Sequence, residues 1–293
     1  MSSESGSSDA FASRKATLIA TALAIACVAI PFWFWIDTWF GKSLTDAQIE
    51  EYLTDAERPR RAQHALAQIS ERIAAGDESV KVWYPRVLEL SRHELPELRL
   101  TVAWLMGDDP SSEEFHQTLR IMVGDPHPMV RRNAALALAN FGDPGGRAEM
   151  RGMLQPHRLE STHAGTVMNR LEPGDSFDAG ALLVRIQPDG GGEPLDVRAE
   201  LPGILDRQLH ADGDRIGAGE AVTVVRPEST HVLQALLGLY LVGTRDDIEL
   251  IQPYQRPRDG LSAQVAQQAV LTLERIRSRA ADQASKPLTD GSI

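Results

Sequence analysis

The sequence predicts an α + β multidomain protein with an N-terminal transmembrane helix, a helical solenoid and a small all-β domain. Three observations lead to this class: one long apolar run, helical segments that recur about every 32 residues, and a glycine-aspartate phrase that occurs twice. The predicted boundaries are 1–15 for a cytoplasmic tail, 16–40 for the transmembrane anchor, 43–156 for helical repeats, 157–227 for the β domain, 228–280 for C-terminal helices and 281–293 for a disordered tail.

Composition and charge limit the classes of function. Of the 293 residues, 42% are hydrophobic and 24% are charged, which is typical of folded protein. The net charge of −11 disfavours nucleic acid and anionic lipid surfaces as partners of the soluble part. The single cysteine, Cys27, excludes an intramolecular disulfide.

The apolar run over residues 16–36 has the length of a bilayer-spanning helix. Arg14 and Lys15 precede it, so the positive-inside rule predicts a cytoplasmic N-terminus and soluble domains outside the cytoplasm, in the periplasm if the chain is bacterial. Three tryptophans of the kind found at membrane interfaces lie at or just beyond its far end: Trp33, Trp35 and Trp39.

Two other interpretations of this run are weaker. A cleaved signal peptide needs small residues after the apolar core, and the bulky residues 32–35 stand there instead. The segment ending in Cys27 faintly resembles a lipoprotein box, but the apolar run continues past the cysteine. An uncleaved membrane anchor is therefore expected.

After the anchor the chain becomes rich in alanine, leucine, arginine and glutamate at helical spacing. The clearest predicted helix begins at Pro128, carries an apolar face and ends at Gly142-Asp143. A second one begins at Pro96 and ends at Gly107-Asp108, about 32 residues earlier. Amphipathic helices at this period predict a solenoid.

These two segments resemble the first helices of HEAT repeats. The residues that carry the resemblance are Pro96, Arg99, Pro128, Val130, Arg131, Gly142 and Asp143. Arg99 and Arg131 are expected to form ion pairs between repeats or to bind helix-end carbonyls. Trp83 and Trp104 are expected in the solenoid core rather than on a binding platform.

The β domain is predicted from the two similar phrases at 174–180 and 213–219, each preceded by a glycine that opens a strand-like run. A Gly-Asp pair favours a tight turn with positive φ, and the two copies indicate two intertwined half-sandwiches. The predicted structural turn residues are Gly165, Gly174, Asp175, Gly180, Gly203, Gly213, Asp214 and Gly219.

Residues 157–227 resemble the biotinyl/lipoyl-like barrel-sandwich domain, including the form found in HlyD-type membrane-fusion (periplasmic adaptor) proteins. Carrier members of that superfamily hold a lysine on the hairpin between the halves, whereas residues 187–196 contain none, so no cofactor is expected. Adaptor members usually carry a long helical hairpin at this junction, where this chain has a glycine turn.

Helical patterns resume after the β domain, at 232–242, 246–251 and 265–276. Under one interpretation, the β domain is inserted between two turns of a single solenoid. Under the other, the last helices form a separate C-terminal subdomain.

No catalytic residue or metal ligand set is predicted. The eight histidines are scattered, and nucleotide-binding and nucleophile motifs are absent from the sequence. Asp175 and Asp214 recur at equivalent positions, but turn formation explains them better than an acid pair does.

The leading hypothesis is a non-enzymatic, membrane-anchored scaffold or adaptor that binds protein partners. The resemblance to membrane-fusion proteins implies an export or efflux assembly with an ABC-type permease, its ATPase or envelope components, and a ring-like homo-oligomer. The alternative is an accessory or carrier-derived subunit of an envelope enzyme complex. An extracytoplasmic sensor is a third and weaker hypothesis.

Overall fold

The computed structural model describes residues 43–55, 58–256 and 260–285. The predicted tail at 1–15, the anchor at 16–40 and its three interface tryptophans lie outside these residues. Within the described part, none of the helices combines the length and the apolar character needed to cross a bilayer. The chain divides into two compact units, Met1–Thr54 and Asp55–Ile293. The described part of the first unit holds α2 (Asp46–Thr54).

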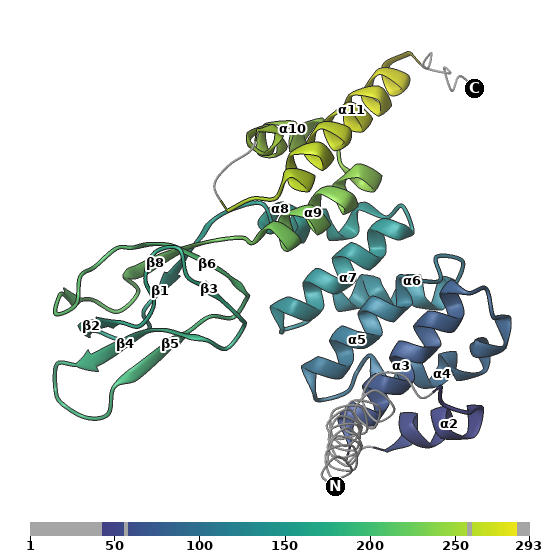
Figure 1. Cartoon of the computed structure of the whole chain (residues 1–293), viewed down its shortest axis with the longest axis horizontal. Coiled ribbons are helices and arrows are strands. Elements are labelled where there is room, and N and C mark those ends of the chain that lie inside the picture. Colours follow the sequence, from purple (N-terminus) through teal and green to yellow (C-terminus); the bar gives the residue numbers. More distant parts are fainter. Residues whose placement is uncertain (1–42, 56–57, 257–259, 286–293) are drawn as a thin grey trace, which may run out of the picture. The chain divides into compact units, whose positions relative to one another are not determined.

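The second unit begins with the predicted helical repeats (Figure 1). Their elements are α3 (Pro59–Ala74), η1 (Glu78–Trp83), α4 (Tyr84–Leu90), α5 (Pro96–Met106), α6 (Glu113–Met122), α7 (Pro128–Asn140), η2 (Pro144–Gly146) and α8 (Arg147–Gly152). Pro96 and Pro128 each stand in the first turn of their helix, where a missing N–H costs nothing. α5 contacts both α3 and α7, while α6 packs against α5 and α7.

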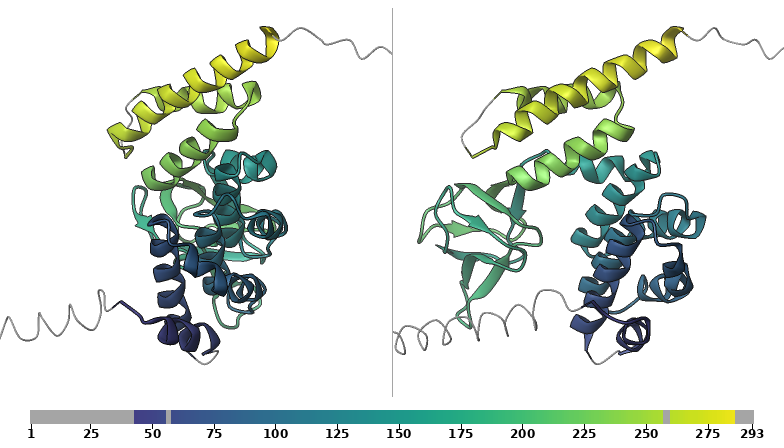
Figure 2. Two further views of the ribbon diagram at one scale, coloured as in Figure 1. Left: turned by 90° about the vertical axis from the view of Figure 1, so that its right-hand side faces the viewer. Right: turned by 45° about the vertical axis from the view of Figure 1, so that its right-hand side comes forward.

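The helices after the β domain continue this packing (Figure 2). They are α9 (Ser229–Val242), η3 (Arg245–Asp247), α10 (Ile248–Ile251), η4 (Gln252–Gln255) and α11 (Ala263–Ser285). α9 contacts α7, α8 and α11. Since α11 runs to Ser285, the expected end of the helical region at residue 280 was five residues too early.

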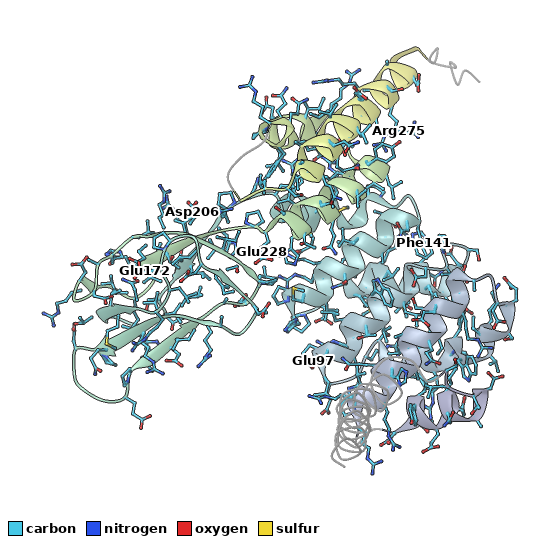
Figure 3. The ribbon with its side chains drawn as sticks, viewed as in Figure 1. Glu97, Phe141, Glu172, Asp206, Glu228 and Arg275 are labelled. Carbon is cyan, nitrogen blue, oxygen red and sulfur yellow. The ribbon has the colours of Figure 1, made fainter. Side chains whose placement is uncertain are left out.

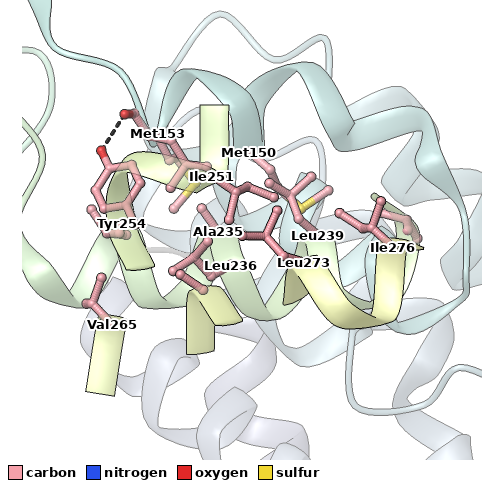
Figure 4. Close-up of a cluster of buried hydrophobic side chains, with 14 of the residues drawn as sticks. Met150, Met153, Ala235, Leu236, Leu239, Ile251, Tyr254, Val265, Leu273 and Ile276 are labelled. Carbon is pink, nitrogen blue, oxygen red and sulfur yellow. Dashed lines mark hydrogen bonds between the residues drawn. The ribbon is translucent and has the colours of Figure 1, made fainter. Parts of the chain in front are cut away.

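One hydrophobic core joins helices from both sides of the β domain (Figure 4). Met150 and Met153 lie in it together with Leu236 and Leu239 of α9 and with residues of α11. The Tyr254 hydroxyl donates a hydrogen bond to the backbone carbonyl of Leu154, one hundred positions earlier. The helices on either side of the β domain therefore share one core, and the insertion of that domain into a single solenoid stays a prediction.

The β domain consists of two four-stranded antiparallel sheets. Its strands are β1 (His157–Glu160), β2 (Gly165–Asn169), β3 (Ser176–Phe177), β4 (Leu182–Pro188), β5 (Leu195–Arg198), β6 (Gly203–Gln208), β7 (Arg215–Ile216) and β8 (Ala221–Arg226). One sheet has the order β1-β8-β6-β3 and the other β5-β4-β2-β7. The first half of the domain holds β1 to β4, and the second half holds their counterparts β5 to β8 in the same order. Replacing each strand by its counterpart converts one sheet order into the other, so the sequence repeat is also a repeat of the fold.

The glycines that open the second strand of each half allow close approach of neighbouring backbone or side chains. A Cβ added to Gly165 would lie 2.2 Å from the carbonyl oxygen of Gln187, and one added to Gly203 would lie 2.6 Å from Cγ1 of Val225. Between the sheets lies a separate core that includes Val167, Leu205 and apolar residues of β4 and β8.

Candidate protein-binding groove

α5, α7 and α9 line an open groove of about 510 Å³. Trp104 of α5 borders it from one side, and Leu237, Tyr240 and Leu241 of α9 border it from the other. The relative exposures of these four residues, in that order, are 49%, 49%, 36% and 45%. The groove is therefore flanked by large apolar side chains that the fold leaves in contact with solvent.

Two glycines allow close packing beneath this rim. A Cβ on Gly107 would lie 3.0 Å from Cβ of Ala137 in α7, and one on Gly238 of α9 would lie 2.3 Å from Sδ of Met150 in α8. Neither position has room for a larger side chain. Arg275, which Figure 3 labels, belongs to α11. Its guanidinium lies over the Tyr240 ring, 5.9 Å from the ring centroid.

Amide side chains in the groove are bound to the fold. Asn140 Nδ2 donates to the carbonyl oxygen of Gly107 at 3.1 Å, and Asn133 Nδ2 donates to that of Met129 at 2.9 Å. Asp108 is the charged member among the described residues that line the groove. The site is thus apolar with one acidic group.

The Asp108 carboxylate accepts a hydrogen bond from the hydroxyl of the buried Ser70. Burial raises the pKa of Asp108, and the bond from Ser70 opposes this only in part. Within the described residues, the ion pairs of the helical repeats involve other carboxylates. Asp108 is a partly buried acid that has a hydroxyl partner and, among the residues that the structure describes, no cationic one.

Other aspartates of the repeats make an Asx turn with the backbone that follows them. Oδ1 of Asp77, Asp109 and Asp143 accepts the backbone N–H two residues later, at 3.0, 3.1 and 2.8 Å. Asp109 is therefore the counterpart of Asp143, and the sequence alignment of Gly107-Asp108 with Gly142-Asp143 was wrong by one residue.

The residue before the turn-forming aspartate is a glycine with positive φ in two of these three loops, at Gly76 and Gly142. In the middle loop it is Asp108. This acid is an addition to the repeat, since Asp109 already makes the turn.

The Asp143 carboxylate, in contrast to that of Asp108, has an arginine and an imidazole as neighbours. Its Oδ2 accepts from Arg120 Nε at 2.6 Å and lies 2.8 Å from His116 Nε2. Burial opposes ionisation, but Arg120, the Gly145 amide and His116 outweigh it and hold the pKa of Asp143 at about 2.

Arg99 and Arg131 occupy equivalent places in successive repeats. Arg99 Nε lies 2.7 Å from Oδ2 of Asp125, and its Nη1 donates to the carbonyl oxygens of His93 and Glu94. Arg131 Nε lies 2.9 Å from Oε1 of Glu149. Its Nη1 likewise donates to two carbonyl oxygens, in the loop before α7. Both side chains are held within the fold, and Val130 lies in the core beside them.

The expectation for the two tryptophans is right for one and wrong for the other. Trp83 is buried, with 4% exposure, and Arg72 lies over its ring. Trp104 is half exposed on the groove. Helical spacing alone could not separate them, because the opposite rim comes from α9, more than 120 residues later in the chain.

The two Gly-Asp turns of the β domain have the same geometry. Oδ2 of Asp175 accepts from the backbone N–H of Glu172 at 2.9 Å, and Oδ2 of Asp214 accepts from that of Ala211 at 2.7 Å. Gly174, Gly180, Gly213 and Gly219 have φ between +81° and +104°. These carboxylates act within their own turns rather than as a pair.

The described residues contain no group of three or more His, Cys, Asp or Glu side chains arranged to hold a metal ion.

A family model described as HEAT repeats matches residues 84–160. The TPR repeat-containing protein PA4299 of Pseudomonas aeruginosa is 33% identical over 124 residues, which cover 41% of this chain and 49% of that protein. The chain thus spans about half the length of this curated relative.

Two solved structures share a small part of the chain. The Kluyveromyces lactis urea carboxylase matches 24% of this chain and 6% of its own, with a TM-score of 0.23 and 26% identity. A single-chain, multi-domain long-chain acyl-CoA carboxylase matches 29% and 8%, with a TM-score of 0.23 and 22% identity. The prediction of HEAT repeats is confirmed, and the resemblance to HlyD-type adaptors stays a prediction.

Proposed function

We propose that the protein is a non-enzymatic scaffold and that the groove between α5, α7 and α9 binds an apolar segment of a partner protein. The observation that carries this proposal is the exposure of Trp104, Leu237, Tyr240 and Leu241 around one groove. Exposed apolar residues that cluster around a groove mark interaction sites, and tryptophan and tyrosine supply much of the binding energy at protein interfaces.

The dimensions and chemistry of the groove suit a helical segment. Leu237 and Leu241 are four residues apart on α9 and present a row of apolar side chains along one helix face. A partner helix with apolar residues at similar spacing can place them between this row and Trp104. HEAT repeats stack into extended surfaces of this kind.

The wider assembly is also part of the proposal. Residues 16–40 anchor the chain with its N-terminus in the cytoplasm, and the soluble domains work outside the cytoplasm beside an ABC-type permease, its ATPase or other envelope components. The β domain is a barrel-sandwich module that docks a second component, an assignment supported by its two sheets related through the sequence repeat. It carries no lysine for acylation, which favours docking over a carrier role.

The test is purification of the full-length chain from chemically crosslinked membranes of its source. Wild type is compared with Leu237→Glu, which places a charge on the groove, and with Val82→Glu, which places the same charge on an exposed residue of η1 that does not line the groove. Circular dichroism establishes that both variants are folded.

We expect Leu237→Glu to lose a set of proteins that wild type and Val82→Glu recover. Equal recovery by all three chains would contradict binding at the groove. If the proteins that Leu237→Glu fails to recover include an ABC permease or ATPase, the proposed export assembly is supported. If they are only unrelated envelope proteins, the export role is rejected and the scaffold function still stands.

A further inference from the structure

We infer that the partner segment carries a lysine or arginine, and that the groove binds this cationic side chain between the Asp108 carboxylate and the Trp104 ring. The inference rests on the proposed function and specifies the chemistry of the partner. Both residues line the same groove: Trp104 lies in the last turn of α5, and Asp108 follows two residues after that helix ends.

The first argument is the state of Asp108 in the free protein. Its carboxylate is partly removed from water and accepts a hydrogen bond from Ser70, but no basic side chain of the described repeats pairs with it. A partly buried carboxylate forms a stronger ion pair with a cation than an exposed carboxylate does. Part of its hydration is already lost, and the ion pair is less screened by solvent and salt. Asp143 already has Arg120 and offers no such vacancy.

Two neighbouring features favour a cation at the same place. The Trp104 ring is half exposed, and the face of an indole attracts ammonium and guanidinium groups. α5 ends at Met106, and the carbonyl end of a helix carries partial negative charge. The Asp108 carboxylate, the Trp104 ring and the C-terminal end of α5 therefore all favour a cation in one part of the groove.

The apolar rim defines the rest of the partner segment. Leu237, Tyr240 and Leu241 offer no charge, so the residues opposite them must be apolar. The predicted occupant is an amphipathic helix of another protein that places one basic residue on its otherwise apolar face. A second copy of this chain is a competing occupant that the experiment must distinguish.

The experiment selects peptides from a phage-displayed library of helices randomised along one face, against the full-length chain in detergent micelles. Clones eluted by heat are sequenced, and selected peptides are synthesised for fluorescence-anisotropy titration. The variants are Trp104→Ala, Asp108→Asn and, as a matched control, Asp178→Asn, which makes the same change at an exposed β-domain residue outside the groove.

We expect selected peptides to combine apolar residues with lysine or arginine on the randomised face. Asp108→Asn, which retains an oxygen to accept the Ser70 hydroxyl, should weaken their binding about tenfold, while Asp178→Asn leaves it unchanged. Replacing the basic residue of a peptide by glutamine should abolish the difference between wild type and Asp108→Asn.

Three results overturn the inference in distinguishable ways. Peptides that are apolar but uncharged, bind equally to wild type and Asp108→Asn and fail on Trp104→Ala, would reject the cation and leave the proposed function standing. Failure to obtain any peptide whose binding depends on Trp104 would reject both. Light scattering that shows a dimer dissolved by Trp104→Ala would replace the partner helix with a second copy and also overturn the inference.

Discussion

The β domain and the helical repeats both arise from internal repetition, but they differ in how faithfully the repeat is kept. In the β domain, Asp175 and Asp214 make the same bond in the same turn, three residues back along the chain. In the helical repeats, the residue before the turn-forming aspartates Asp77, Asp109 and Asp143 is Gly76, Asp108 and Gly142 in turn. The β domain repeats a structural device, whereas the helical part departs from its own pattern at the groove.

In a repeat protein, the position at which one copy departs from the others is a candidate for function. A residue that every copy uses to make the same turn is explained by the fold. Asp108 is not required for this turn, because Asp109 makes it, and Asp108 lines a groove beside an exposed tryptophan. Asp109 therefore has a structural role, whereas the role proposed for Asp108 is contact with a partner.

We expect the largest loss of stability from a substitution in the core that helices before and after the β domain share. Leu239→Ala removes a fully buried side chain and should lower the free energy of unfolding by about 2 to 5 kcal/mol. Leu241→Ala, on the same helix but exposed, should change it by less than about 0.5 kcal/mol. Urea denaturation followed by circular dichroism measures both.

If the shared core makes these helices cooperative, Leu239→Ala should shift the whole helical transition to lower urea. A wild-type-like helical transition remaining beside a shifted one would mean that the C-terminal helices unfold as a separate subdomain.

The second effect is the pH dependence contributed by Asp143. Because its pKa in the folded protein is lowered to about 2 from an ordinary value near 3.8, its ionised form stabilises the fold by about 2 kcal/mol at neutral pH. This contribution is present above about pH 3.8 and is lost as the pH falls towards 2. Asp143→Asn should therefore be less stable than wild type at pH 7, and the difference should shrink below pH 4.

Urea titrations of Asp143→Asn at a series of pH values test this prediction, with Asp178→Asn as the control. A difference between wild type and Asp143→Asn that stays constant from pH 7 to pH 2 would exclude the ion pair with Arg120 as its source.

The third effect tests the equivalence of the two β-domain turns. Asp175→Ala and Asp214→Ala each remove one hydrogen bond from a backbone N–H and should each destabilise the β domain by about 1 kcal/mol. Thermal unfolding of the two variants should give similar shifts in Tm. A large shift for one and none for the other would show that the two halves are not equivalent in energy.

The smallest stability effect belongs to Asp108. Burial raises its pKa, so ionisation is less favourable in the folded protein than in the unfolded chain, and wild-type stability should rise as the pH falls through the folded pKa. Asp108→Asn should consequently equal or exceed wild type in stability at pH 7, measured by urea denaturation. A marked loss of stability at pH 7 would assign Asp108 a structural role like that of Asp143.

Local signals in the sequence predicted the elements but not the groove. Pro96 and Pro128 indicated where helices begin, and the Gly-Asp phrases indicated the β turns, because these features depend on residues close together in the chain. The exposure of Trp104 depends on α9, which follows the inserted β domain. The one-residue shift between Asp108 and Asp109 became visible only through the hydrogen bond from the Ser111 amide that marks Asp109 as the turn-forming residue.

Site-specific photocrosslinking in intact source cells is the most direct test of whether the groove between α5, α7 and α9 binds a segment of a partner protein. A photoreactive benzoylphenylalanine replaces Trp104 on the groove or, for comparison, Val82 on η1. We expect the probe at residue 104 to form adducts with an apolar segment of another protein that also contains a basic residue, and the probe at residue 82 to form none with that segment. Equal adducts from both positions, or none from residue 104, would contradict the groove as the binding site.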